Sequence, residues 1–116
     1  MKIYLASRFS NHEKLNRLAA RLVADGHIII STWHTTEAIS PISKDHPDYL
    51  DNCVHAANRD LKEIAESDAI LLVTENCDAI PGGMWFEAGY AKALGKACFI
   101  QGPRINIFCH LCSEWQ

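Results

Sequence analysis

The sequence has no excess of positive charge and no long apolar run. Eleven Lys and Arg stand against 14 Asp and Glu, which gives a net charge of −3. A protein that binds duplex nucleic acid needs a basic surface to neutralise phosphates, so we expect no duplex nucleic acid partner. The longest clearly apolar run, 69–73, is far shorter than the roughly 20 residues that cross a bilayer, so we expect no membrane association.

Motifs that bind common cofactors and metals are missing as well. The sequence has no Gly-x-Gly-x-x-Gly, no phosphate loop and no Gly-x-Ser-x-Gly. Cys109 and Cys112 lack a second ligand pair at zinc spacing, so we expect them to pack as small apolar side chains. We therefore expect neither a metal nor a cofactor. Five cysteines and the absence of a signal peptide favour reduced thiols and a cytoplasmic location.

The apolar pattern predicts alternating strands and helices in one domain, 1–116. Hydrophobic residues make up 48% and charged residues 22%, as in an average soluble protein. We expect strands at 2–6, 28–33, 68–73 and 97–101, helices at about 11–25, 48–66 and 84–94, and an irregular tail after Pro103. Ser10 and Glu13 are expected to form a capping box at the start of the first helix. The helix 48–66 carries one apolar stripe that includes Leu50 and Val54.

Strand–helix alternation with almost continuously apolar strands is typical of a parallel sheet covered on both faces. We therefore expect an α/β fold, a flavodoxin/Rossmann-like three-layer sandwich with a parallel sheet of four to five strands. Ligands of such sheets bind at the carboxyl ends of the strands, where the strand order reverses. The expected site then involves Ser7-Arg8, the loop after Trp33, the turn 74–83 and the loop after Gln101.

One acidic residue stands out in the apolar helix 84–94. Glu87 lies in its first turn, and a carboxylate among aromatic residues is costly unless it is paired or used. The helix dipole offers an ordinary explanation, because it favours an acid at this position. Gly82 and Gly83 shift the balance towards a ligand site, because glycines let a ligand approach the backbone closely.

Asp60 is a second candidate, on the flank of the helix 48–66. Taken alone, it is most simply interpreted as a solvated surface residue beside Arg59. With Glu87 it makes a pair of carboxylates suited to glycosidic chemistry, in which one attacks the anomeric carbon and the other, protonated, assists the leaving group. Trp33 and His34 offer rings that could stack on a base, with ordinary packing as an equal alternative.

Four segments in order resemble the nucleoside 2-deoxyribosyltransferase family, which includes the 2-deoxynucleoside 5-monophosphate N-hydrolases. The most specific runs from Gly83 to Ala91, followed by Gly95-Lys96, and is similar to the family's Gly-rich turn, nucleophilic Glu and Gly-Tyr-Ala. The others are Asn58-Arg59-Asp60-Leu61 with Ser67-Asp68, the segment His46–Leu50, and Ile105-Asn106-Ile107. The resemblance extends from Ile3 to about Phe108.

The resemblance implies a role for each matching residue. Glu87 would be the nucleophile on C1 of deoxyribose, and Asp60 would handle protons near the leaving base or orient the sugar. Asn106 would reach into the site of a neighbouring subunit, so we expect a homo-oligomer, a dimer or larger. Ser7 matches a Ser that helps hold the 5-phosphate in the hydrolases. The remaining candidate substrate-binding residues are Arg8, Trp33, His34, Gly82, Gly83 and Tyr90.

The implied activity breaks the N-glycosidic bond of 2-deoxyribonucleosides. An ionised Glu87, kept charged by the helix N-terminus, would stabilise an oxocarbenium-like transition state and capture C1. The glycosyl-enzyme would pass the sugar to another nucleobase or to water. We favour transfer. Hydrolysis of 2-deoxynucleoside 5-monophosphates is the alternative, because Pro81 stands where the transferases carry a base-contacting Asp and the nearest acid is Asp78. A non-catalytic nucleotide-binding module also stays open.

Overall fold

The computed structural model describes residues 1–35, 43–77 and 82–116 and contains a five-stranded, all-parallel sheet. The strands are β1 (Lys2–Ala6), β2 (Ile28–Ile29), β3 (Ala69–Val73), β4 (Ala97–Gln101) and β5 (Ser113–Glu114). The helices are α1 (His12–Ala24), α2 (Tyr49–Glu66) and α3 (Gly83–Ala93), with 3₁₀ helices at Phe9–Asn11 and Ile107–Leu111. The predicted α/β fold with a parallel sheet is confirmed.

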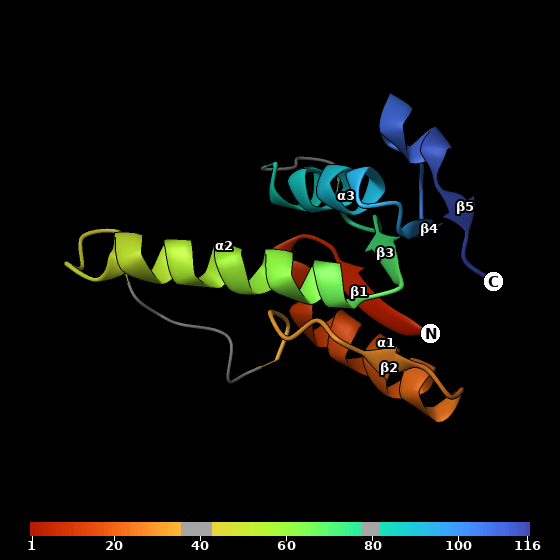
Figure 1. Cartoon of the computed structure of the whole chain (residues 1–116), viewed down its shortest axis with the longest axis horizontal. Coiled ribbons are helices and arrows are strands. Elements are labelled where there is room, and N and C mark those ends of the chain that lie inside the picture. Colours follow the sequence, from red (N-terminus) through yellow and green to blue (C-terminus); the bar gives the residue numbers. More distant parts are fainter. Residues whose placement is uncertain (36–42, 78–81) are drawn as a thin grey trace.

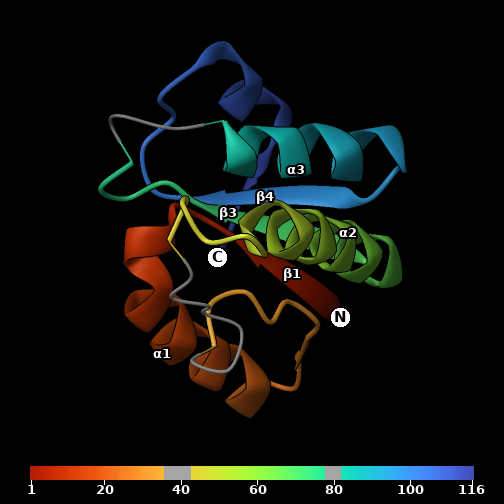
Figure 2. The same ribbon diagram turned by 90° about the vertical axis from the view of Figure 1, so that its left-hand side faces the viewer.

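Helices cover both faces of the sheet and make three layers (Figure 1, Figure 2). Alternate residues of a strand point to opposite faces, so β1 and β3 each contribute to two cores. On one face α1 packs on the sheet through a core of Leu15, Leu18, Leu22, Ile3, Leu5, Leu71 and Val73. On the other face α2 and α3 pack on it through a core that includes Ile64, Met84, Ala91, Tyr4, Ala6, Ile70 and Leu72.

The strand order β2-β1-β3-β4-β5 fixes where a ligand site forms. The chain steps from β1 outward to β2 and then returns to the other side of β1 to continue with β3 and β4. The direction of winding therefore reverses between β1 and β3, and the helices that follow these strands leave on opposite faces. A crevice is expected at the carboxyl ends of these two strands, which are Ala6 and Val73.

The first helix does not begin with the predicted capping box, so that prediction was wrong. Ser10 lies inside the 3₁₀ turn Phe9–Asn11, and α1 starts only at His12. Asn11 occupies the N-cap position but makes no side-chain cap. Its amide nitrogen donates instead to Ser7 Oγ at 2.9 Å and to the Glu75 carbonyl at 2.9 Å. This turn connects the end of β1 to the loop that follows β3.

The second strand is shorter than predicted, ending at Ile29 rather than near Trp33. The residues that follow it are held by hydrogen bonds that involve side chains instead of by regular pairing with β1. Ser31 Oγ accepts from the Leu5 amide at 3.0 Å, and both the amide and the hydroxyl of Thr32 donate to Glu63, at 3.0 and 2.8 Å. These bonds turn the chain towards the carboxyl end of β1 and bring Trp33 over the sheet.

The segment after β4 is more regular than the expected irregular tail. It forms the 3₁₀ helix Ile107–Leu111 and the edge strand β5, which pairs in parallel with β4. The Asn106 side chain begins that helix by accepting from the amides of Phe108 and Cys109, at 2.9 and 3.3 Å. Such a cap satisfies amides that a short helix leaves without internal partners.

Helix α2 is only half covered. Ile64 near its carboxyl end is buried in the core, whereas Leu50 and Val54 near its start are 74% and 61% exposed. The reason is length, because the amino-terminal end of α2 projects beyond the sheet (Figure 1). The predicted apolar stripe therefore contacts the core only in the later turns. No helix in the described parts of the chain is long and apolar enough to cross a membrane.

Candidate active site

A cleft of about 670 Å³ opens at the carboxyl ends of β1 and β3. Its lining comes from four segments: the residues that follow β1, Trp33, the middle of α2, and the start of α3. These residues are Ser7, Arg8, Phe9, Ser10, Trp33, Ala56, Ala57, Arg59, Asp60, Leu61, Gly83, Met84, Phe86 and Glu87. The cleft therefore unites Ser7, Arg8, Trp33, Asp60, Gly83 and Glu87 from the sequence prediction. The loop after Gln101, also expected there, contributes no residue to this lining.

The Glu87 carboxylate is held by a buried phenol. Tyr4, in the centre of β1 and fully buried, donates its hydroxyl hydrogen to Glu87 Oε2. Burial raises the pKa of Tyr4 above its ordinary value, so the phenol keeps its proton and stays a donor. The bond fixes one oxygen of the carboxylate against the sheet.

Burial outweighs the helix N-terminus in setting the charge of Glu87. Desolvation raises the pKa of this carboxyl to about 7, and the negative charges of Asp60 and Glu63 act in the same direction. The hydrogen bond from Tyr4 opposes the shift, as does the charge of Arg59. The sequence predicts that the helix N-terminus keeps this carboxylate charged, whereas in the structure burial raises its pKa and so favours the protonated form.

Asp60 lies in the same cleft, on α2, and is paired with its neighbour. Arg59 donates to Asp60 Oδ1 from Nη2 at 3.0 Å and from Nε at 3.3 Å. Burial raises the pKa of Asp60, while the hydrogen bond and charge of Arg59 oppose that rise. Asp60 is thus a partly buried carboxyl at the cleft, not the solvated surface residue that its position alone favoured.

The far end of the cleft is formed by the segment after β1. Ser7 Oγ donates to the Val73 carbonyl at 2.7 Å and accepts from the Asn11 amide group at 2.9 Å. Arg8 Nη1 donates to the Asn76 carbonyl at 2.8 Å. The Ser7 hydroxyl therefore ties β1 to β3, and Arg8 brings a positive charge to the lining.

Trp33 and Gly83 form further parts of the lining. Trp33 donates from Nε1 to the Leu5 carbonyl at 2.7 Å, which orients its ring over the sheet. Gly83 is the first residue of α3, and among the described residues no atom beyond its chain neighbours and its own helix backbone lies within 4 Å of the place where a Cβ would stand. The backbone there faces open space, as the ligand-site interpretation of these glycines requires.

Four predicted site residues lie outside this lining. His34 is buried and bonds through Nε2 to Ser31 and through Nδ1 to Asn16, at 2.9 and 2.8 Å. Tyr90 packs against the core under α2 and α3, and Gly82 precedes α3 at the surface. Asn106 caps the 3₁₀ helix Ile107–Leu111. Pro81 and Asp78 lie outside the described residues.

Sequence reasoning did not identify Tyr4 or the carboxylate of Glu63. A signal for Tyr4 was present, because a phenol in a continuously apolar strand must find a partner for its hydroxyl. Glu63 holds Thr32 through both of its oxygens and so fixes the segment that carries Trp33. In the described parts of the chain no group of three or more His, Cys, Asp or Glu side chains could hold a metal ion.

Comparisons with known proteins identify the family and the fold of the chain. The family model described as nucleoside 2-deoxyribosyltransferase matches residues 3–106. The chain belongs to this family. Family membership indicates an enzyme of the glycosyltransferase or N-glycosidase type, and the family acts on nucleosides and nucleobases. A search of curated proteins found no match.

Two solved structures share the fold. The 2-deoxyribosyltransferase of Bacillus psychrosaccharolyticus is 27% identical, with a TM-score of 0.69, over 97% of this chain and 82% of that one. The CMP N-glycosidase BcmB of Clostridium botulinum is 17% identical, with a TM-score of 0.57, over 97% of this chain and 83% of that one. The layered α/β fold of this chain is therefore shared across chains of low identity.

Proposed function

We propose that this deoxyribosyltransferase-family protein moves 2-deoxyribose from one nucleobase to another through a covalent Glu87–deoxyribosyl intermediate. The observation that carries the proposal is the placement of Glu87 and Asp60 in one cleft at the switch point of the sheet, the place between β1 and β3 where the direction of winding reverses. Glu87 comes from α3 and Asp60 from α2, so the two carboxyls approach the cleft from different elements. A sugar held between them would meet an acid and a nucleophile, as retaining glycosidic chemistry requires.

The first step would break the bond between C1 and the base nitrogen. One oxygen of ionised Glu87 attacks C1, and the electron pair of the breaking bond goes to the departing base. Asp60 supplies a proton to that base, a role that fits a carboxyl whose pKa is raised by burial. The Tyr4 hydroxyl remains on the other oxygen of Glu87 and positions the carboxylate. In the second step a nitrogen of a new base attacks C1, the bond between C1 and Glu87 breaks with its electron pair returning to the carboxylate, and the proton of that nitrogen passes to Asp60.

Aromatic side chains at the mouth of the cleft would hold the base. Phe9 and Phe86 line the cleft and are 55% and 69% exposed, which is unusual for large apolar side chains unless they have a ligand or a partner. Trp33 lines it as well. Flat rings of this kind stack on any nucleobase, so they favour binding without strong base selection.

Hydrolysis of 2-deoxynucleoside 5-monophosphates is the second candidate function. It is favoured by the Arg8 and Arg59 side chains, which bring two positive charges to the lining, and by Ser7 and Ser10 at the same end as Arg8. Guanidinium groups suit phosphate recognition because their fork of donors matches the phosphate oxygens. In this reaction water would replace the second base.

We also propose that the enzyme is a homo-oligomer in which Asn106 contacts the site of a neighbouring subunit. Within one chain Asn106 caps its own 3₁₀ helix and does not line the cleft. A role in substrate binding therefore requires a second copy. Sedimentation of the active species tests this directly, because a strictly monomeric active enzyme would remove that role from Asn106.

One assay separates the candidate functions. Purified protein is supplied with a deoxynucleoside and a second free base, or with a deoxynucleoside monophosphate alone, and products are followed by chromatography. Exchange of bases supports transfer, whereas free base with deoxyribose 5-phosphate supports hydrolysis. Tight nucleotide binding without turnover, unchanged in Glu87→Ala, would instead indicate a non-catalytic binding module. Mass spectrometry of acid-quenched protein tests the intermediate, since deoxyribose should stay attached to the peptide that contains Glu87.

A further inference from the structure

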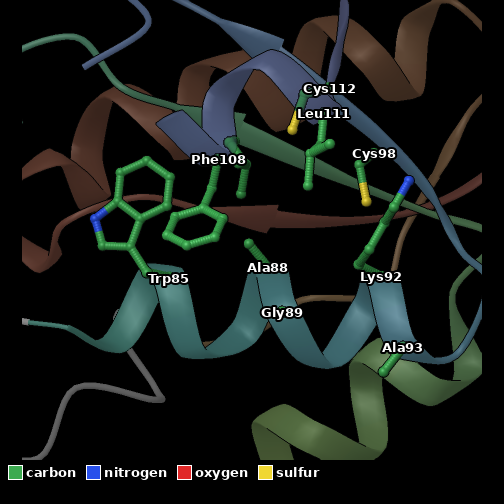
Figure 3. A pocket seen from close by; sticks show the side chains of 10 residues that line it. Trp85, Ala88, Gly89, Lys92, Ala93, Cys98, Phe108, Leu111 and Cys112 are labelled. Atoms are coloured by element: carbon green, nitrogen blue, oxygen red, sulfur yellow. The ribbon is translucent and has the colours of Figure 1, made fainter. Parts of the chain in front are cut away.

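A second cavity, of about 490 Å³, lies between α3 and the carboxyl-terminal segment (Figure 3) and shares no lining residue with the cleft. It is bounded by α3 on one side and by β3, β4 and the carboxyl-terminal 3₁₀ helix on the other, and its lining is mainly apolar. Two thiols, Cys98 and Cys112, stand in this lining together with the ammonium group of Lys92. Nothing in the proposed glycosyl transfer uses these three side chains.

The pairing of β4 with β5 brings the two cysteines close together. In that pairing, Phe99 is the register partner of Ser113 and Ile100 is the partner of Glu114. Cys98 directly precedes Phe99 on β4, and Cys112, at the end of the 3₁₀ helix, directly precedes Ser113, so extending the register by one residue would put the two cysteines opposite each other. Register partners on parallel strands point to the same face, about 4.8 Å apart, and a disulfide needs Cα atoms about 4.4 to 6.8 Å apart. Figure 3 shows both side chains directed into the cavity.

The other thiols are less suited to pairing with Cys112. Cys109 belongs to the 3₁₀ helix, and its side chain is fully buried in the core, where an oxidant has no access. Cys77 is buried beside Ser7 at the opposite end of α3, and Cys53 is exposed on α2. Only Cys98 and Cys112 are half-buried, line one cavity and directly precede the paired residues of β4 and β5.

We propose that Cys98 and Cys112 form a reversible disulfide that fastens the carboxyl-terminal segment to β4, with a low-molecular-weight disulfide as the oxidant. This is a modification site, and it replaces the expectation that the tail cysteines only pack. Disulfides inside cells are usually transient and redox-sensing, which suits a pair formed and broken by exchange. The proposal is independent of the reaction catalysed at Glu87.

The exchange runs in two balanced steps. The Cys98 thiolate attacks one sulfur of glutathione disulfide, the S–S bond of that molecule breaks, and one glutathione thiolate leaves. The Cys112 thiolate then attacks the Cys98 sulfur, and the second glutathione thiolate leaves. Two protein thiols are oxidised, one disulfide is reduced to two glutathione thiols, and the two protein protons pass to solvent or to these thiolates. Burial raises the pKa of both thiols, and the positive charge of Lys92 opposes that rise for each of them. The same balance holds if Cys112 attacks first.

The edge strand can give the small movement that bond formation needs. A disulfide brings Cβ atoms to about 3.8 Å, closer than unbonded strand neighbours. β5 is only two residues long, and both of them are exposed. It is held by pairing with β4, including the Trp115 amide donating to the Ile100 carbonyl at 2.9 Å, by Arg104 and by the packing of Trp115 on Phe99. Such a strand shifts at little cost compared with a central one.

The test is oxidation of the full chain by glutathione disulfide, followed by mass spectrometry. Trypsin cleaves after Lys96 and Arg104, so Cys98 falls in the peptide 97–104 and Cys112 falls in the peptide 105–116 with Cys109. The expected product is a cross-link between these two peptides that dithiothreitol removes. The melting temperature should rise by about 5 °C on oxidation, because a loop in the unfolded chain is closed. A disulfide within 105–116, or recovery of Cys98 as a free thiol, would overturn the proposal.

Matched variants identify the partner of Cys98. Cys109→Ser should cross-link as the native chain does, whereas Cys112→Ser should stop at a glutathione adduct on Cys98. A Cys53→Ser background removes the exposed thiol that could join two chains. Reduced forms of all variants are first compared by thermal unfolding, and Cys112→Ala replaces the serine variant if that one is unstable. Cross-linking that persists without Cys112 would assign the bond to Cys109 and contradict the proposal.

Discussion

Helix α3 borders two cavities, of about 670 and 490 Å³, and they differ in chemistry. The cleft at the ends of β1 and β3 gathers two carboxyls and two guanidinium groups. The second cavity, over β4 and the carboxyl-terminal segment, has an apolar lining with two thiols and one ammonium group. Glu87 and Ala88 are neighbours in sequence, yet one lines the first cavity and the other lines the second.

The difference follows from the switch point of the sheet. Only between β1 and β3 do the connections leave on opposite faces, so only there do several loops converge on an open crevice. Polar side chains in that crevice face water and ligand. On the β4 side the strand edge is covered by the chain's own tail, which leaves an apolar hollow. The comparison indicates that the position of a cavity in the sheet decides its chemistry more than its size does.

Removing the carboxylate of Glu87 should have the largest effect on the activity of the cleft. In Glu87→Gln the nucleophile is lost, so we expect base exchange to fall at least about a thousandfold. Lys92→Gln, on the same helix but at the second cavity, is the matched control and should keep near-native activity. Rates are followed by chromatography, with circular dichroism to check the fold. A Glu87→Gln enzyme with most of its activity would refute the nucleophile.

Neutralising Asp60 should have the next largest effect. Asp60→Asn removes the proton donor for the departing base, and we expect kcat to fall about a hundredfold. The loss should be smaller for substrates whose base leaves easily without protonation. Asp51→Asn is the control, because Asp51 is exposed on the same helix. Equal losses for good and poor leaving bases would contradict a role in protonation.

Tyr4→Phe tests whether the hydrogen bond from Tyr4 sets the pKa of Glu87. The phenol lowers the pKa of Glu87, so its removal should raise that pKa above about 7. Native activity is expected to rise with pH as Glu87 ionises, and in the variant this rise should move to higher pH, with kcat at neutral pH about tenfold lower. Tyr49→Phe serves as the control. A pH profile of kcat that keeps its midpoint in Tyr4→Phe would show that the bond does not tune the carboxyl.

The smallest expected effect is on stability. Glu87 has a pKa of about 7 in the folded chain and 4.5 as its ordinary value, so the native fold loses stability as pH rises between these values. The glutamine side chain in Glu87→Gln does not ionise, so this variant does not lose stability over the same pH range. Its melting temperature should match the native one near pH 4 and exceed it by about 3 °C near pH 8. Thermal unfolding across this pH range measures the difference in melting temperature. If the fold stabilised Glu87 as an anion, the variant would melt below the native chain near pH 8.

Local patterns and fold class could be predicted because they depend on neighbouring residues. The run Ala69–Val73 is apolar at every position, so it predicts a strand buried on both faces. Glu87 could be found because an acid in an apolar helix conflicts with its surroundings. Tyr4 was missed since its partner lies on α3, far away in sequence. The strand 28–33 was predicted too long because Glu63, also distant, bonds Thr32.

The sequence by itself determined the order of strands and helices along the chain, the parallel sheet and the acidic residues worth considering. These features depend on the apolar pattern and composition of short segments, whose residues are close together in the sequence. Only the tertiary structure decided that Asp60 enters the same cleft as Glu87, that His34 is a buried member of a hydrogen-bond network, and that Cys98 and Cys112 line one cavity. Each of these facts joins segments far apart in the chain. Their contacts depend on how layers pack and strands register, which no local pattern specifies.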